Sequence, residues 1–232
     1  HRDLHSFPTR RSSDLRCLLA FALVLVPVTA QDLPARLDDI LFRLDGTEGV
    51  RTWDLAQDLR DEARTDSIRS VPHLVEAAQD VQPAVQLVIA RTLLELDAPH
   101  DSSEILLGLI DGPMAEDALS MLSDRAFHRV DEVGDALHRF LSEPHAAPLR
   151  VAAARSLYKV AGDIRTRTQA RGTLIESLDS DDPEVRALGA LALAEISDFD
   201  PARPVLRTLT ADPGALGQLA RAYLETDEKI DY

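Results

Sequence analysis

A short apolar segment recurs along this chain, and its spacing limits what the chain can fold into. The longest copies are Gln82–Leu93 (QPAVQLVIARTL) and Asp182–Leu193 (DPEVRALGALAL), and shorter copies begin at Leu149 and Ala215. Their first apolar positions lie 64, 36 and 30 residues apart, and the longest gap leaves room for a degenerate copy at Pro113–Leu122. A period of roughly 30–36 residues indicates a stacked array of small units rather than one closed core.

The apolar pattern inside each unit is that of α-helices. Apolar residues recur three and four positions apart, as in Val71, Leu74 and Val75, and alternating runs typical of strands are nearly absent. Pro and Asp in the short breaks suit the first turn of a helix, where proline loses no hydrogen bond and aspartate caps. Each unit is therefore a pair of helices, with a shorter amphipathic helix such as Ser103–Ile110 before the repeated one. A further unit opens near Val50.

The best-preserved copy contains the motif Asp-Pro-x-Val-Arg, at Asp182–Arg186. This motif resembles the HEAT-repeat family in its short bacterial form, which is related to phycobilisome-lyase repeats. The resemblance extends over nearly all of the chain after residue 30. It implies an α-solenoid that binds other proteins, and it implies that Asp182 and Arg186 bridge neighbouring repeats. We predict an all-α, right-handed α-solenoid of stacked antiparallel helix pairs over residues 31–232, with five or six pairs.

The beginning of the chain does not follow this pattern. Residues 1–15 include the string SFPTRRSSDL, which resembles the translation of a short-read sequencing adapter. We interpret residues 1–15 as an artefactual segment outside the fold. The alternative is a basic arm built on Arg10, Arg11 and Arg16.

An apolar run at Leu18–Val28 follows. Its eleven residues are too few for a membrane-spanning helix, which needs about 20. Small residues at Val28 and Ala30 precede a polar chain, and this small-x-small pattern is what signal peptidase recognises. We therefore predict that residues 16–30 are the remnant of a signal peptide cleaved after Ala30, and that the protein is periplasmic or extracellular. The alternative is a buried N-terminal helix.

Composition and motifs offer little for catalysis. The one cysteine, Cys17, excludes a disulfide framework and a cysteine-based zinc site. A net charge of −15 without a basic stripe argues against nucleic acid as a partner. The sequence contains no His-Glu-x-x-His, no phosphate-binding glycine loop and no Gly-x-Ser-x-Gly motif. We expect no cofactor, no metal and no catalytic residue.

Three local features have both a structural and a functional interpretation. His100 and His128 lie near carboxylates at expected helix starts, where acidic side chains serve capping better than they would serve a metal. The acidic run Asp179–Glu184 lacks the central glycine and terminal glutamate of a calcium loop, so we interpret it as a turn and N-cap. Trp53 lies among Leu55 and other apolar residues and is predicted to belong to the core.

One constellation suggests a binding surface. The sixth residue after the first apolar position of each copy points away from the core on a helical wheel. Arg91, Arg155, Leu191 and Arg221 occupy this position. On the concave side of a solenoid they would form a ridge that binds carboxylates of a partner.

Local ion pairs are the alternative, and the one we favour for this ridge. An acid follows Arg91 and Arg221 four residues on, whereas Lys159 follows Arg155. Arg155 is therefore expected to be the least neutralised of the three arginines and the most available to a partner. Because the wheel places it outside the core, Arg155→Ala is expected to leave stability nearly unchanged.

These observations favour an exported, non-catalytic interaction module. A protein or peptide would bind to the concave face, with no nucleic acid and no stable membrane insertion after cleavage. Two alternatives stay open: a lyase-like enzyme or enzyme subunit of the phycobilisome-lyase type, and a purely structural envelope protein.

Overall fold

A computed structural model describes residues 33–47 and 51–230 of the chain. The adapter-like segment, the predicted signal peptide and its predicted cleavage site after Ala30 lie outside the described residues. Within the described ranges, every regular element is helical, with twelve α-helices and one 3-10 helix. The prediction of an all-α chain with about ten to twelve helices is confirmed.

The helices follow one another with short connections. In chain order they are α2 (Leu33–Asp45), α3 (Arg51–Arg64), α4 (Ser67–Ala77), α5 (Pro83–Glu95), α6 (Pro99–Leu109), α7 (Ala115–Met121), the 3-10 helix η2 (Arg125–Arg129), α8 (Asp131–Ser142), α9 (Ala147–Val160), α10 (Ile164–Ser177), α11 (Pro183–Glu195), α12 (Phe199–Leu209) and α13 (Ala215–Ile230).

Aspartate and proline begin several of these helices. The Asp182 carboxylate accepts a hydrogen bond from the Glu184 amide at 2.9 Å, and Pro183 occupies the first turn of α11. Asp163 caps α10 in the same way, and the hydrogen bond from the Thr166 amide lowers the pKa of Asp163 below its usual value. The acidic run before α11 is thus a turn that contains an N-cap, as predicted.

Two details of the predicted helix pairs are wrong. Helix α6 begins at Pro99 rather than at Ser103, because proline in the first turn needs no amide partner. The first helix of a pair is also not consistently shorter, since α10 has 14 residues and α11 has 13.

The repeat equivalence inferred from sequence has a structural counterpart at the ends of α5 and α11. Asp97 and Ser197, each twelve residues after the first repeat valine, are the non-glycine residues of the described chain with positive φ, at 62° and 63°. In each turn, the next amide donates to the carbonyl five residues earlier. These bonds join Ala98 to Leu93 at 3.0 Å and Asp198 to Leu193 at 2.9 Å. The two helices therefore end in the same Schellman-type turn.

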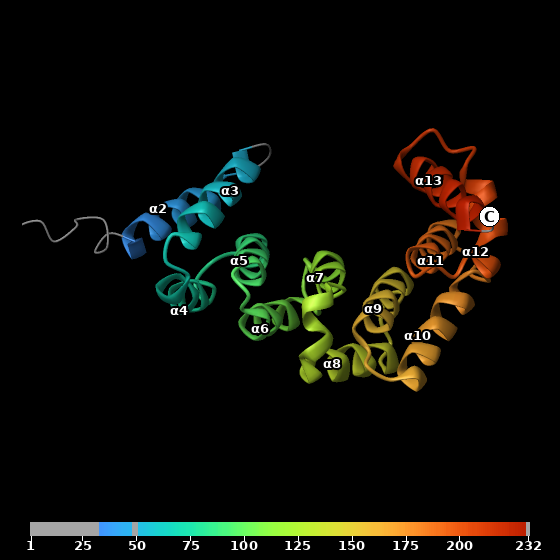
Figure 1. Cartoon of the computed structure of the whole chain (residues 1–232), viewed down its shortest axis with the longest axis horizontal. Helices are drawn as coiled ribbons and strands as arrows, with labels where there is room; N and C mark the ends of the chain where they lie inside the picture. The colour runs from blue at the N-terminus through green and yellow to red at the C-terminus, as the bar shows by residue number, and fades with distance from the viewer. Residues whose placement is uncertain (1–32, 48–50, 231–232) are drawn as a thin grey trace, which may run out of the picture.

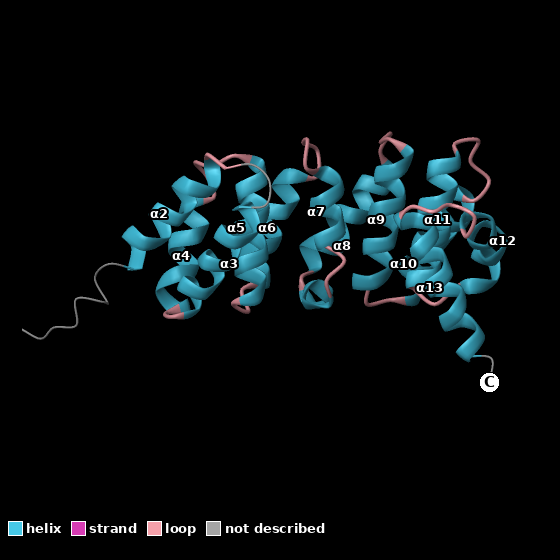
Figure 2. Ribbon diagram, turned by 90° about the horizontal axis from the view of Figure 1, so that it is seen from above, coloured by secondary structure: helices cyan, strands magenta, loops and turns pink. Residues whose placement is uncertain are grey.

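The helices pack in sequential pairs along a curved array. Figure 1 shows α3, α5, α7, α9, α11 and α13 along the inner side of an arc, and α4, α6, α8, α10 and α12 along its outer side. Successive inner helices contact one another from α3 to α13, and each also packs on a neighbouring outer helix. Figure 2 shows the array from another side as one row that begins at α2 and ends at α12, with α13 drawn in front of the last helices. This arrangement is consistent with a helical repeat.

The buried side chains form two apolar clusters that meet at α5. Val85, Ile89 and Leu93 belong to the cluster of α2 to α5, whereas Ala90 belongs to the larger cluster that continues toward α13. Ile105 on α6 packs against both clusters. Helix α5 therefore joins the two halves of the core, because its buried residues pack into both clusters.

The acidic C-terminal part of α13 is only partly exposed to solvent. Asp227 on α13 is buried, and its carboxylate accepts hydrogen bonds from the Arg203 guanidinium of α12 at 2.8 Å. The neighbouring Glu225 and Glu228 are exposed. Asp227 thus joins α13 to α12, while Glu225 and Glu228 lie at the surface.

Helices α10 and α11 approach each other closely at Gly189. A Cβ atom there would overlap the Ser177 hydroxyl and lie 3.3 Å from the Leu174 carbonyl oxygen. Gly172, also on α10, has no such neighbour within 4 Å.

We expect Gly189→Val to lower the free energy of unfolding by about 2 kcal/mol or more, because the added methyl groups would force α10 and α11 apart. Gly172→Val is the matched control and is expected to change stability by less than about 0.5 kcal/mol. Urea denaturation of both variants measures the difference. Equal stabilities would contradict this packing.

Candidate functional site

An apolar groove of about 420 Å³ opens between the inner helices α3, α5 and α7. Its apolar walls come from Trp53 and Ala56 on α3, Leu87 and Val88 on α5, and Met121 on α7. The volume lies within the range of about 300–1,000 Å³ that is common for binding sites. Met and aromatic side chains are also the apolar types most enriched at protein interfaces.

Trp53 does not belong to the core, contrary to the sequence prediction. Its side chain is 76% exposed, whereas Leu55, Leu59 and Ala63 of the same helix are buried. Trp53 lies two positions before Leu55, which places it on another side of α3. The sequence prediction was wrong because it relied on the apolar neighbours of Trp53 in the sequence. The side chain lines the groove instead of the core.

The charges at the groove differ between its two walls. Arg60 and Arg91 lie on the α3 and α5 side, and Asp117 lies on the α7 side. The two arginines converge on the Glu95 carboxylate, with nitrogen–oxygen distances of 3.7 and 3.1 Å, and Arg64 joins them at 2.7 Å. Arg64 also pairs with Asp61 at 3.6 Å. Three guanidinium groups therefore face two carboxylates, so this wall keeps positive charge for a partner.

The four residues of the predicted ridge do not share one environment. Arg91 is half exposed and pairs with Glu95, which confirms the local pair expected from sequence. Leu191 is buried at 9% exposure, so its predicted outward position is wrong. Arg221 donates to the Thr210 carbonyl at the end of α12 at 2.6 Å. A helical wheel describes one helix and contains no information on the neighbouring helix pairs. These pairs cover part of the helix surface that the wheel assigns to solvent.

Arg155 is not the least neutralised cation, which corrects the sequence expectation. Its guanidinium donates to the Ser120 hydroxyl at 2.9 Å and lies 3.5 Å from the Glu195 carboxylate. Lys159 binds the same carboxylate at 2.8 Å. The side chain of Arg155 is only 23% exposed. The carboxylate belongs to the next inner helix, α11. A search for pairs four residues apart on the same helix therefore could not identify it.

The structure places the predicted inter-repeat pair within one helix pair. Asp182 caps α11, and Arg186 donates to the Ser180 carbonyl in the turn between α10 and α11. Contacts between neighbouring inner helices come instead from Glu95, which joins α3 to α5, and from Glu195, which joins α9 to α11.

Sequence analysis identified Glu95 only as the local partner of Arg91 and missed Glu195, although a signal for contacts between helices was present at both positions. Each lies ten residues after the first valine of its copy, in the two copies that match best. An acid repeated at the same position of a stacked array is a candidate for contacts between repeats. Burial also raises the pKa of Tyr223 on α13, and the Glu195 charge adds to this effect.

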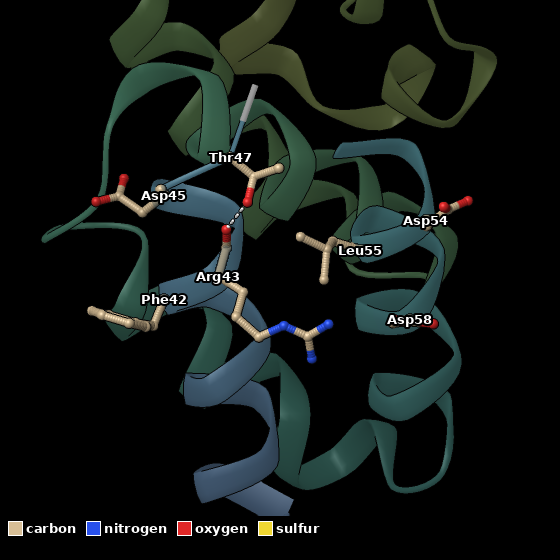
Figure 3. Close-up of a pocket in the computed structure, with 8 residues that line it drawn as sticks. Phe42, Arg43, Asp45, Thr47, Asp54, Leu55 and Asp58 are labelled. Atoms are coloured by element: carbon tan, nitrogen blue, oxygen red, sulfur yellow. Dashed lines mark hydrogen bonds between the residues drawn. The ribbon is translucent and has the colours of Figure 1, made fainter. Parts of the chain in front are cut away.

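Among residues 33–47 and 51–230, neither the other pockets nor the histidines form a group of three metal ligands. Figure 3 shows a polar pocket between α2 and α3, where the Asp45 and Asp54 carboxylates point to opposite sides. His100 and His128 do not join a cluster either, since no group of three His, Cys, Asp or Glu residues in the described ranges is arranged to hold a metal ion.

Comparison with protein-family models, curated proteins and solved structures finds no match to this chain. Within residues 33–47 and 51–230, none of the helices is both long and apolar enough to cross a bilayer.

We expect Glu95→Gln to lower the free energy of unfolding by about 1 kcal/mol, because three neighbouring guanidinium groups would lose their shared carboxylate. The loss should decrease at high salt, where the remaining repulsion is screened. Glu116→Gln removes an exposed carboxylate from α7 and serves as the control. Chemical denaturation at two salt concentrations measures both variants, and equal effects would argue against the role assigned to Glu95.

Proposed function

We propose that this protein is a non-catalytic interaction module that binds a protein or peptide on its inner face. The exposure of Trp53 beside an apolar groove carries the proposal. Burying a large aromatic side chain in a partner gives more binding energy than most other contacts, and such residues are enriched among interface hot spots.

The groove favours a segment with one apolar anchor. That side chain would occupy the space between Trp53, Leu87 and Met121. An acidic group on one side of the anchor would meet Arg91, and a basic group on the other would meet Asp117. Because the two walls differ in charge, they would also fix the direction in which the segment lies.

The sequential helix pairs and the shared turn at the ends of α5 and α11 support a HEAT-like, right-handed solenoid as the scaffold. In such arrays neighbouring units create an extended concave surface without requiring any catalytic group. The run Leu18–Val28 and the small residues before Gln31 support export to the periplasm or the extracellular space.

A random peptide library displayed on phage provides the test, since it samples many segments without a choice of natural partner. The selected peptides should share an apolar or aromatic residue with an acid nearby. Trp53 is the only tryptophan of the chain, so its fluorescence reports directly on the groove. Its emission should shift to shorter wavelength when a peptide covers the indole ring.

We expect Trp53→Ala to weaken peptide binding by about 2 kcal/mol or more, while stability changes by less than about 0.5 kcal/mol. Ile68→Ala is the matched control, because Ile68 is 87% exposed but lies on α4, outside the groove. Calorimetry and thermal unfolding measure the two effects. Peptides that bind Trp53→Ala as tightly as the unchanged chain would refute the proposal.

A further inference from the structure

A second pocket, of about 370 Å³, lies where η2 meets the end of α9, the start of α10 and the end of α11. Three of its lining residues are cations from three different elements: Arg125 on η2, Lys159 on α9 and Arg167 on α10. Glu195 is the one carboxylate in the lining. This concentration of positive charge is unusual for a chain with a net charge of −15.

The structure holds Arg167 in place without occupying its terminal nitrogens. Its Nε donates to the Ala161 carbonyl at 2.8 Å. Its two terminal nitrogens have no hydrogen-bond or ion-pair partner among residues 33–47 and 51–230. They have the geometry that binds two oxygens of a phosphate or carboxylate group. Because the backbone already fixes the side chain, little side-chain entropy would be lost when an anion binds.

The charge of Glu195 does not cancel the cations of the pocket. Its carboxylate is shared between Lys159, at 2.8 Å, and Arg155, at 3.5 Å, and Arg155 lies outside the lining. The exposed Arg125 has no ion pair among the described residues. Arg125 and Arg167 are thus the two cations of the lining that Glu195 leaves without a counter-charge.

The remaining wall suits the body of a small organic molecule. Tyr158 and Ile196 provide apolar surface, and the Ser123 hydroxyl adds a polar group. The His128 ring is fixed by a contact of 3.0 Å between its Nδ1 and the Val160 carbonyl. A few polar groups around an apolar wall are typical of small-molecule sites.

We propose that this pocket binds a small organic dianion, either a phosphomonoester or a dicarboxylate. Arg125 and Arg167 bind the oxyanion, Lys159 adds a point charge, and Tyr158 and Ile196 contact the body of the ligand. The site is separate from the groove at Trp53. The proposal for this pocket is therefore independent of the proposed function.

Isothermal titration calorimetry of the full chain tests this site, with inorganic phosphate in one arm and succinate in the other at constant ionic strength. Arg125→Gln and Arg167→Gln should each weaken binding by about tenfold, because each removes a charged contact. Arg129→Gln is the matched control, since Arg129 lies on the same 3-10 helix but outside the lining. It should change the affinity by less than about threefold, as a screened surface charge.

Each outcome has a distinct meaning. Binding of phosphate alone supports a phosphomonoester, and binding of succinate alone supports a dicarboxylate. Binding of neither anion overturns the proposal. An equal loss in Arg129→Gln also overturns it, because the attraction would then be a general effect of charge. Arg167→Gln also removes the contact with Ala161 and could lower stability. Arg125→Gln removes an exposed side chain, so it tests the site without this effect.

Discussion

Burial between neighbouring helix pairs is the constraint on which the rest of this structure depends. A pair of short helices cannot remove its own apolar side from water, so each pair needs the next one. Helix α5 illustrates this, because Ile89 packs into one apolar cluster and Ala90 into the other. Close approach requires small residues at some positions, as at Gly189 against Ser177. The curvature of the array then gathers the inner helices along one side (Figure 1).

Carboxylates at two equivalent positions shape the electrostatics of that inner side. Glu95 and Glu195 each bind cations of their own or the preceding inner helix. Because each carboxylate attracts more than one cation, positive charge collects locally on an acidic chain. The Arg91 side of the groove and the Lys159 side of the second pocket are both consequences of this arrangement.

Both candidate sites lie between repeats rather than within one. The groove takes Trp53 from α3, Leu87 from α5 and Met121 from α7, and the second pocket takes cations from η2, α9 and α10. A stacked array can therefore carry different chemistry at each junction while every unit keeps the same helices. No short motif records such a site, because its residues are far apart in the chain.

The sequence by itself determined the helices and their repetition. Apolar spacing, together with the Pro and Asp at helix starts, depends on neighbours within a few residues, so it predicted α11 at Pro183 and the equivalence of Val85 and Val185. Only the tertiary structure decided where side chains point relative to other repeats. In the tertiary structure Trp53 is exposed, Leu191 is buried, and Arg155 pairs with Glu195 of another helix. The physical reason is that burial and ion pairing between repeats depend on how the pairs stack, which a single-helix pattern does not contain.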